Sequence, residues 1–422
     1  MKYQKLTLKN GLRVIIAPML DTQTATVLVM TGVGSRFETR AENGLAHFLE
    51  HMFFKGTQKR PTAFDISQEL DGLGAEYNAF TGEEYTGYYA KVAARHWGKA
   101  LDVVSDLFLN AKLEQEEIDR ERGAILQEIN MYEDMPMRRV HEYFKTLLYG
   151  DTPLGWDIAG PKSNIQSFQR EDFVKFLNRG YVAENIVVGV AGNIDPKAVK
   201  KAVSEIFSTV RPGKKAKALK AKEVQKAPQL VVKEKKIDQT QFVVGCRAYH
   251  MTHKKRAVLS VLAAILGGGM SSRMFIEVRE RRGLAYRVGT SAESFVDAGY
   301  LETHCGVEHE NLEKALVVVM DEYKKIRTEL VSKDELKKAK EGIKGRMAMG
   351  LEGSDEVIEF LVGQEVLTGN IKLIKDRVKE IDAVTAEDVL KAAKDIFQNQ
   401  KLNLAVIAPK ANKSKLEKLL QF

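Results

Sequence analysis

Alternating apolar and polar residues at the start of the chain predict a β-hairpin. Residues 3–8 and 12–17 alternate in this way, and Asn10-Gly11, a dipeptide that favours a tight hairpin turn, lies between them. A longer apolar run over residues 24–33 predicts a further strand. Similar strand patterns recur in both halves of the chain, over residues 85–92, 186–191, 230–232, 241–246 and 402–407.

Helical periodicity is clear in two segments of the first half. Residues 45–54 are mostly apolar and predict a buried helix that begins near Asn43 and ends at Gly56. Residues 116–134 predict a second helix, which ends before Pro136. Its apolar stripe consists of Ile118, Ile125, Ile129 and Tyr132. Because helices lie between hairpin-connected strands, we expect an α+β fold in which each half of the chain is an antiparallel-rich sheet covered by helices.

Length and charge predict two domains joined by a basic linker. A chain of 422 residues is too long for one typical domain. Residues 214–226 contain six lysines against Glu223 alone, which accounts for most of the formal net charge of +8. Proline and glycine flank this run, so it reads as a solvated linker. We therefore predict domains over residues 1–212 and 229–422, connected by residues 213–228.

Composition excludes several classes of protein. The basic run has alanines interleaved and no aromatic residues, whereas a nucleic-acid site places basic groups on a folded face with aromatic residues for stacking, so we expect no nucleic-acid partner. Two cysteines, Cys246 and Cys305, are too few for a disulfide framework and indicate a reducing compartment. Neither a secretory signal nor an apolar run of membrane-spanning length is present, so we expect a cytoplasmic protein without a membrane partner.

His47, Glu50 and His51 form the motif that carries chemistry. The two histidines are separated by one helical turn, so they project from one face of the predicted helix and can share a metal ion. Glu50 lies beside them as a candidate base. Ionisable groups in a buried helix are costly without partners, and a metal would be a partner for both imidazoles. The order H-x-x-E-H is the inverse of the zinc peptidase motif H-E-x-x-H and supports the same chemistry.

Glu128 is the best candidate for a third ligand. Together with Glu121 it falls into the apolar stripe of the helix over residues 116–134. Two carboxylates on an inward face require a cation. The alternative is a pair of buried salt bridges to Arg120 or Arg122.

These motifs and the length of the chain resemble the pitrilysin family of zinc metallopeptidases, in particular the bacterial members of its mitochondrial-processing-peptidase-type subfamily. The resemblance extends over nearly the whole chain. It implies that His47, His51 and Glu128 bind one catalytic Zn²⁺ per chain and that Glu50 is the general base. It also implies that Glu121 is a carboxylate behind the ligands.

The same resemblance assigns substrate-binding residues. Arg279 and Tyr286 match the arginine and tyrosine with which the family holds substrate and stabilises the reacting carbonyl. Without the resemblance, Arg279 would be interpreted as one of several arginines on a solvated helix face. Tyr286 would be interpreted as the first residue of a strand. Asn78 and Ala79 match the family's N-A-x-T segment, whose backbone pairs with an extended peptide. The alternative there is an ordinary edge strand.

The second half repeats the first without its metal ligands. When Glu117 is aligned with Glu335, Glu128 falls on Arg346, and the helix before Gly267 contains neither histidine nor glutamate. We therefore expect residues 229–422 to supply substrate-binding groups and structure.

The expected function is a zinc endopeptidase that hydrolyses extended or unfolded peptides in a closed chamber. The resemblance implies a homodimer in which Arg279 and Tyr286 of the partner's second domain complete the active site. One alternative is a catalytically inactive partner subunit of the same family, although such subunits typically have a damaged zinc motif. The other is a basic binding protein without metal.

Overall fold

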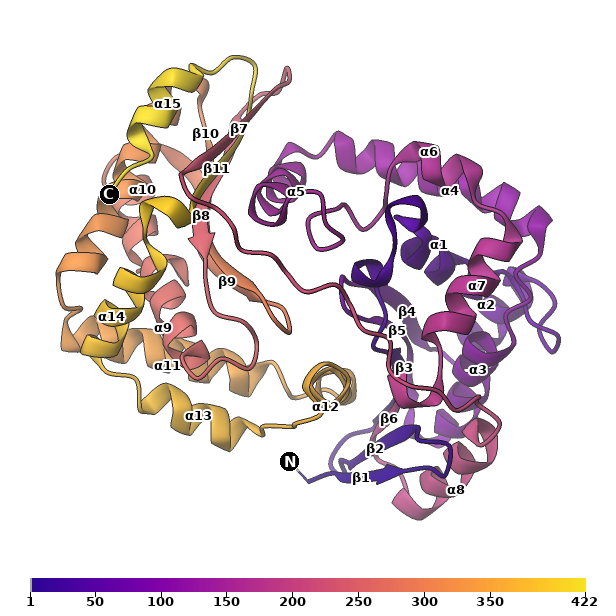
Figure 1. The fold of residues 1–422 in the computed structure, drawn as a ribbon. Coiled ribbons are helices and arrows are strands. Elements are labelled where there is room, and N and C mark those ends of the chain that lie inside the picture. Colours follow the sequence, from indigo (N-terminus) through magenta and orange to yellow (C-terminus); the bar gives the residue numbers. More distant parts are fainter. Residues whose placement is uncertain (1) are drawn as a thin grey trace. The chain divides into compact units, whose positions relative to one another are not determined.

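The computed structural model describes residues 2–422, which form two compact units. Unit 1 consists of the chain up to Asn130, Asp157–Leu219 and Met349–Leu373. Unit 2 consists of Met131–Trp156, Lys220–Ala348 and Ile374–Phe422. Each unit therefore combines segments from both halves of the sequence (Figure 1).

The sheet of unit 1 has six strands in the order β1-β2-β6-β3-β5-β4. All neighbours are antiparallel except β2 and β6, which are parallel. The N-terminal hairpin predicted from the sequence is confirmed, because β1 pairs with β2 in antiparallel register. The strands are β1 (Gln4–Thr7), β2 (Arg13–Pro18), β3 (Thr24–Thr31), β4 (Glu76–Thr81), β5 (Thr86–Ala93) and β6 (Ile186–Gly192).

Apolar side chains leave both faces of this sheet. Along β3, Val27 and Val29 enter one core, while Leu28 and Met30 enter the core on the other face. One face is covered by helices that include α1 and α3, and α12 covers the other. The helices of unit 1 are α1 (Leu45–Met52), α2 (Ala63–Gly72), α3 (Trp97–Asn110), α4 (Gln115–Glu133), α6 (Lys162–Ser167), α7 (Arg170–Gly180), α8 (Pro196–Phe207) and α12 (Ser354–Thr368).

Unit 2 repeats this plan with five strands in the order β7-β11-β8-β10-β9. β7 and β11 are parallel, and the remaining neighbours are antiparallel. The strands are β7 (Gln229–Glu234), β8 (Thr240–Arg247), β9 (Ala285–Ser294), β10 (Gly299–Val307) and β11 (Leu402–Ala408).

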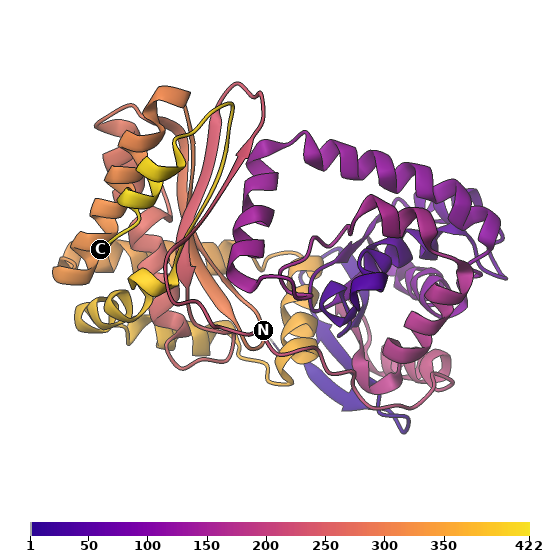
Figure 2. The same ribbon diagram turned by 45° about the horizontal axis from the view of Figure 1, so that its top comes forward.

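The sheet of unit 2 is also covered on both faces. Helices α9 and α10 pack on one face, and α5, drawn in purple beside β7 and β11 in Figures 1 and 2, packs on the other. The helices are α5 (Pro136–Tyr149), α9 (Arg256–Gly267), α10 (Leu312–Thr328), α11 (Lys333–Met349), α13 (Ile374–Asp382), α14 (Ala386–Ile396) and α15 (Lys413–Leu419).

The predicted α+β class, with two similar halves of sheet and helices, is confirmed. The two halves exchange a helix, because α12 follows unit 2 segments in the sequence and covers the sheet of unit 1, whereas α5 comes from the first half and covers the sheet of unit 2. Residues 213–228, predicted as the linker, contain neither helix nor strand. In residues 2–422 no helix combines the length and the apolar character needed to cross a bilayer.

Candidate metal centre

The structure brings His47, His51 and Glu128 together at one point of unit 1. Both histidines project from α1, and Glu128 comes from α4. One ligand atom from each residue lies within 4.8 Å of the others. The Nε2 atoms of His47 and His51 are each 3.5 Å from the same oxygen, Oε2 of Glu128. The three groups thus face a common point.

These distances fit a tetrahedral divalent ion. Zinc bonds of about 2.1 Å at the tetrahedral angle place two ligand atoms about 3.4 Å apart. The observed 3.5 Å is longer than a strong charge-assisted hydrogen bond, so the arrangement matches three ligands of one cation better than a tight ion pair. Two imidazoles and one carboxylate are also a donor set that zinc accepts, with one coordination position left open.

Glu121 supports His51 from behind. Its Oε1 is 2.9 Å from Nδ1 of His51, and its Oε2 is 2.5 Å from Nζ of Lys55. Burial lowers the pKa of His51, but the nearby carboxylates of Glu121 and Glu128 outweigh burial and raise this pKa to about 9. A carboxylate on the far nitrogen of a metal-binding histidine fixes its ring orientation. Of the two carboxylates considered from the sequence, Glu128 therefore faces both imidazoles. Glu121 contacts only one of the two imidazoles, that of His51.

Glu50 lies between the two histidines in the sequence of α1. In the part of the chain that the structure describes, it takes part in no hydrogen bond or ion pair. Its charge acts on Tyr88, whose ring is stacked on Phe53 with ring centroids 4.7 Å apart. Burial, the neighbouring Tyr181 and the charge of Glu50 together raise the pKa of the Tyr88 hydroxyl. Glu50 is therefore free to accept a proton from a bound molecule.

The N-terminus of α1 is held by Glu38, which the sequence did not indicate. Glu38 is 3% exposed and accepts hydrogen bonds from the backbone amides of Ala46 and Gly44 at 2.6 and 3.1 Å and from Asn43 Nδ2 at 3.2 Å. These amides are the ones a helix leaves unsatisfied at its start. Burial raises the pKa of Glu38 to about 8, although the three hydrogen bonds act in the opposite direction.

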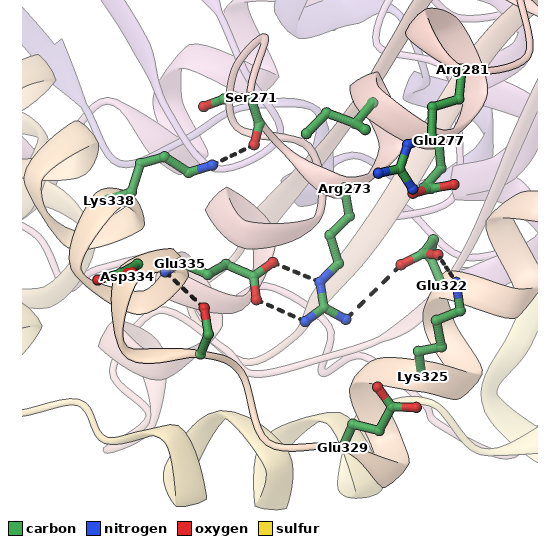
Figure 3. A pocket seen from close by; sticks show the side chains of 12 residues that line it. Ser271, Arg273, Glu277, Arg281, Glu322, Lys325, Glu329, Asp334, Glu335 and Lys338 are labelled. Atoms are coloured by element: carbon green, nitrogen blue, oxygen red, sulfur yellow. Dashed lines mark hydrogen bonds and ion pairs between the residues drawn. The ribbon is translucent and has the colours of Figure 1, made fainter.

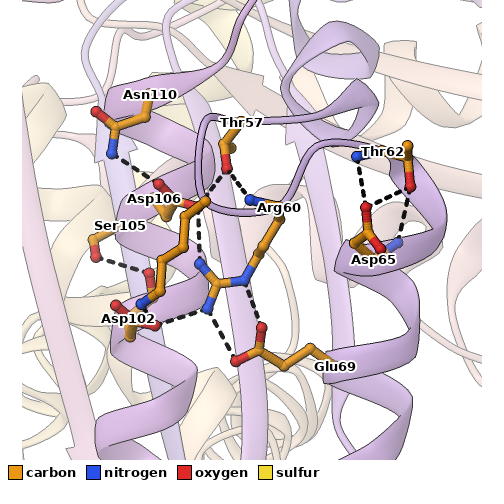
Figure 4. A network of polar contacts seen from close by, with 10 residues as sticks. Thr57, Arg60, Thr62, Asp65, Glu69, Asp102, Ser105, Asp106 and Asn110 are labelled. Carbon is orange, nitrogen blue, oxygen red and sulfur yellow. Dashed lines mark hydrogen bonds and ion pairs between the residues drawn. The ribbon is translucent and has the colours of Figure 1, made fainter.

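A buried arginine fixes the chain at the other end of α1 (Figure 4). Arg60, 2% exposed, donates to Glu69 at 2.7 Å, to Asp102 at 2.7 Å and to Asp106 at 2.8 Å. Asp102 and Asp106 belong to α3, and Asp106 also accepts from the Thr57 hydroxyl at 2.6 Å. The segment that follows α1 is thus bound to α2 and α3.

Arg279 and Tyr286 are brought together in unit 2. Arg279 lies in a π-helical turn, Phe275–Glu280, and its guanidinium donates to the Tyr286 carbonyl at 3.0 Å and lies 4.7 Å from the centre of the Tyr286 ring. Tyr286 is 72% exposed at the start of β9, an edge strand. Its hydroxyl is therefore presented to solvent while its ring is held by Arg279.

Three other arginines near this turn pair with glutamates, and Figure 3 shows Arg273 between Glu335 and Glu322. Arg281 and Arg282 both pair with Glu277, at 2.6 and 2.5 Å. Arg273 forms a bidentate pair with Glu335, with contacts of 2.7 and 2.8 Å, in a cavity of about 470 Å³ lined mainly by charged side chains. These pairs hold the turn that carries Arg279, which itself faces Tyr286.

Asn78 and Ala79 lie in β4, the edge strand of unit 1, as predicted. α1 contacts this strand, so the edge runs beside the metal centre. The Ala79 amide donates to the side chain of Asn78 at 2.9 Å. A backbone donor next to the centre is therefore held by a side chain that can release it.

The repeat in unit 2 has a different chemistry at the corresponding place. Arg346 of α11 donates to the Gly268 carbonyl at the end of α9, at 3.2 Å. The guanidinium of Arg346 therefore binds the end of a helix, whereas Glu128, the residue aligned with it in unit 1, lies beside two imidazoles.

Known proteins identify the family. The profile described as Insulinase (Peptidase family M16) matches residues 13–162, and that of the Peptidase M16 inactive domain matches residues 167–343. A zinc protease of Bacillus subtilis, described as uncharacterized, is 32% identical over 409 residues, covering 97% of this chain and 99% of the relative. The chain belongs to peptidase family M16, the pitrilysin family. A second M16 relative, an uncharacterized zinc protease of Streptomyces coelicolor, is 34% identical over 97% of this chain and 90% of its own length.

Solved structures share the M16 fold. A protease from Helicobacter pylori superimposes with a TM-score of 0.90 at 23% identity, covering 97% of this chain and 99% of that one. A peptidase M16 inactive domain from Pseudomonas fluorescens gives 0.88 at 18% identity, with 97% and 98% covered. Membership of the M16 family makes the protein a zinc metalloprotease with Zn²⁺ as its cofactor, which confirms the resemblance found in the sequence.

Proposed function

We propose that the protein is an endopeptidase that cleaves extended or unfolded peptides at the centre formed by His47, His51 and Glu128. The observation that carries the proposal is the approach of both Nε2 atoms to one Glu128 oxygen, at 3.5 Å, beside the unpaired carboxylate of Glu50. In this proposal residues 1–212 carry the catalytic groups, residues 213–228 are the connection, and residues 229–422 supply substrate-binding groups.

Each residue has a defined role in the proposed reaction. Bound zinc supplies a Lewis acid that polarises the peptide carbonyl and lowers the pKa of water toward about 7. Glu50 removes a proton from the attacking water and transfers it to the leaving amine. Tyr286 donates a hydrogen bond to the carbonyl oxygen as negative charge develops on it, and Arg279 anchors the peptide. Glu121 keeps the His51 ring in the orientation in which it binds metal.

The edge strand β4 supports a preference for extended substrates. A peptide that pairs with an edge strand is recognised by its backbone, so shape decides more than side chains. The Ala79 amide becomes available when the Asn78 side chain turns away. A closed chamber around such a strand would exclude folded proteins, which cannot present an extended segment.

Glu50→Gln tests the proposed base. We expect kcat for an unfolded peptide to fall by about 10²–10⁴-fold, because general-base catalysis is lost, while the zinc content per chain stays unchanged. Peptide cleavage is followed by mass spectrometry and zinc by elemental analysis. Glu116→Gln, an exposed glutamate on α4 whose side chain is 85% exposed, is the matched control and should retain full activity. Normal cleavage by Glu50→Gln would overturn the mechanism.

The alternative function is an inactive structural or partner subunit of the same family. The intact HxxEH motif and the converging third carboxylate favour the enzyme. If the purified chain binds zinc and cleaves no member of a proteome-derived peptide library, the alternative replaces the proposal. A cytoplasmic location stays a prediction from the sequence.

We also propose a homodimer whose partner supplies Arg279 and Tyr286. Two observations support this arrangement. Both residues belong to unit 2, and Tyr286 is 72% exposed, so its side chain can contact a partner subunit. Mixing inactive Glu50→Gln and Tyr286→Phe chains tests this arrangement. If the groups act across the dimer, each mixed dimer contains one complete site and activity returns. If activity does not return although mixed dimers form, the groups act within one chain.

A further inference from the structure

Unit 2 contains a second group of metal-binding side chains, away from the M16 motif. His141 comes from α5, and Glu302 and His304 come from β10. One ligand atom from each lies within 4.8 Å of the others, the same limit that the first centre satisfies. Glu302 and His304 are two residues apart on a strand, so both point to the sheet face that α5 covers.

An ion pair alone leaves this group incomplete. Nδ1 of His141 is 2.7 Å from Oε1 of Glu302. Among residues 2–422, the second oxygen of Glu302, a residue that is 4% exposed, is buried without a hydrogen-bond partner, and so is Nδ1 of His304. Buried polar atoms in native proteins are almost always satisfied, and an unpaired carboxylate oxygen is particularly costly. An unpaired carboxylate oxygen and an unpaired imidazole nitrogen in one small group are both satisfied by one cation.

The neighbouring strand leaves space for the His304 ring. Gly289 of β9 is the cross-strand partner of His304. A Cβ at Gly289 would lie 2.9 Å from Cε1 and 3.2 Å from Nε2 of the imidazole. Because residue 289 has no side chain, the imidazole of His304 can lie over β9 and close to Glu302.

We propose that His141, Glu302 and His304 form a second binding site for a divalent transition metal of the zinc class. Two imidazoles and one carboxylate suit zinc and its first-row neighbours, whereas calcium and magnesium prefer sites made of oxygen atoms. Binding satisfies the free Glu302 oxygen and uses lone pairs of both imidazoles. The site goes beyond the proposed peptidase function, because none of its residues belongs to the catalytic centre.

The site links two segments that are distant in sequence. α5 is the helix that the first half of the chain contributes to unit 2, and it packs on β7, β8 and β11. A metal shared by His141 and the two β10 residues joins this helix to a further strand of the same sheet. The expected role is structural, namely to hold α5 on the sheet of unit 2.

Zinc titration of the full-length chain tests the site. Apoprotein is prepared with a chelator and titrated with Zn²⁺ against a chromophoric competitor. We expect two equivalents per chain in the wild type and one in His47→Ala/His51→Ala, which lacks the first centre. Adding His304→Ala to that variant should remove the remaining equivalent. Zinc should raise the Tm of His47→Ala/His51→Ala and leave the Tm of the triple variant unchanged.

Controls separate this site from surface histidines and from misfolding. His309→Ala, an exposed histidine just after β10, should leave both equivalents in place. Glu302→Gln is a second, nearly isosteric variant that should weaken the second equivalent if His304→Ala fails to fold. One equivalent in the wild type, or no zinc in His47→Ala/His51→Ala, would mean that the group is an ion pair only and would overturn the proposal. Neither result would affect the first centre.

Discussion

Glu38 shows how a single residue couples the catalytic helix to pH. Its carboxyl group is buried at the N-terminus of α1, two positions of which donate to it. Burial raises its pKa from 4.5 to about 8. Because the folded-state pKa lies above the unfolded value, the protonated form stabilises the folded state. This contribution is complete below pH 4.5 and is lost as the pH rises through 8.

Glu38→Gln should remove this pH dependence. Glutamine resembles the protonated acid, so the variant and the wild type should have similar Tm values near pH 5. Between pH 5 and 8 the wild type should lose about 1.4 kcal/mol of unfolding free energy per pH unit relative to the variant. Thermal unfolding of both proteins across this range measures the difference. A difference in Tm that does not change with pH would show that Glu38 ionises normally.

The sequence predicts the convergence of the proposed metal ligands better than it predicts the residues that support them. His47, Glu50 and His51 are adjacent on one helix, so their spacing alone places them together, and the apolar stripe of α4 turns Glu128 inward. Glu38 and Arg60 carry no such pattern. Each is an ordinary charged residue in the sequence, and only the fold brings the first to the amides of α1 and the second to the carboxylates of α3.

At the level of elements, the packing of α12 on the sheet of unit 1 depends on a glycine. Gly189 lies in the middle of β6, on the face that α12 covers. A Cβ there would lie 2.4 Å from Cγ2 of Val362 and 2.5 Å from Cγ1 of Ile358. The helix can approach the strand closely only because this side chain is absent.

Gly189→Ala should therefore displace α12. We expect a loss of about 1–3 kcal/mol in the free energy of unfolding, the usual cost of overpacking a core. The matched control is Gly363→Ala, within α12 itself, where a Cβ meets no atom within 4 Å. That change should stabilise the helix by about 0.5–1 kcal/mol. Denaturant unfolding compares the two, and equal effects would contradict the close approach at Gly189.

Most strands follow directly from the sequence, but the exchanged helices do not. β2, β3 and β6 are apolar on both faces, which predicts that both faces of the sheet are buried. The pattern does not indicate which helices cover each face. The partner of their second face begins at Ser354, far along the chain, and local periodicity contains no information about which sheet a helix will join. The same applies to α5 and the sheet of unit 2.

At the scale of the whole molecule, neither half of the sequence contains a complete unit. Residues 1–212 alone should expose the face of the unit 1 sheet that Val357, Ile358 and Leu361 cover. We expect this fragment to bind an apolar dye and to aggregate. Addition of a peptide spanning residues 349–373 should suppress both effects, whereas a version with Leu361→Asp should not. A monomeric fragment without dye binding would show that the sheet face needs no cover.

The exchange of α12 also determines when the protease can form during synthesis. The side chains proposed to bind zinc are translated early, but the sheet of unit 1 lacks its second layer until residues 354–368 have left the ribosome. For most of translation, the nascent chain therefore contains the HxxEH helix while one face of the sheet of unit 1 is still uncovered. We therefore expect hydrolytic competence only after nearly the entire polypeptide has been made.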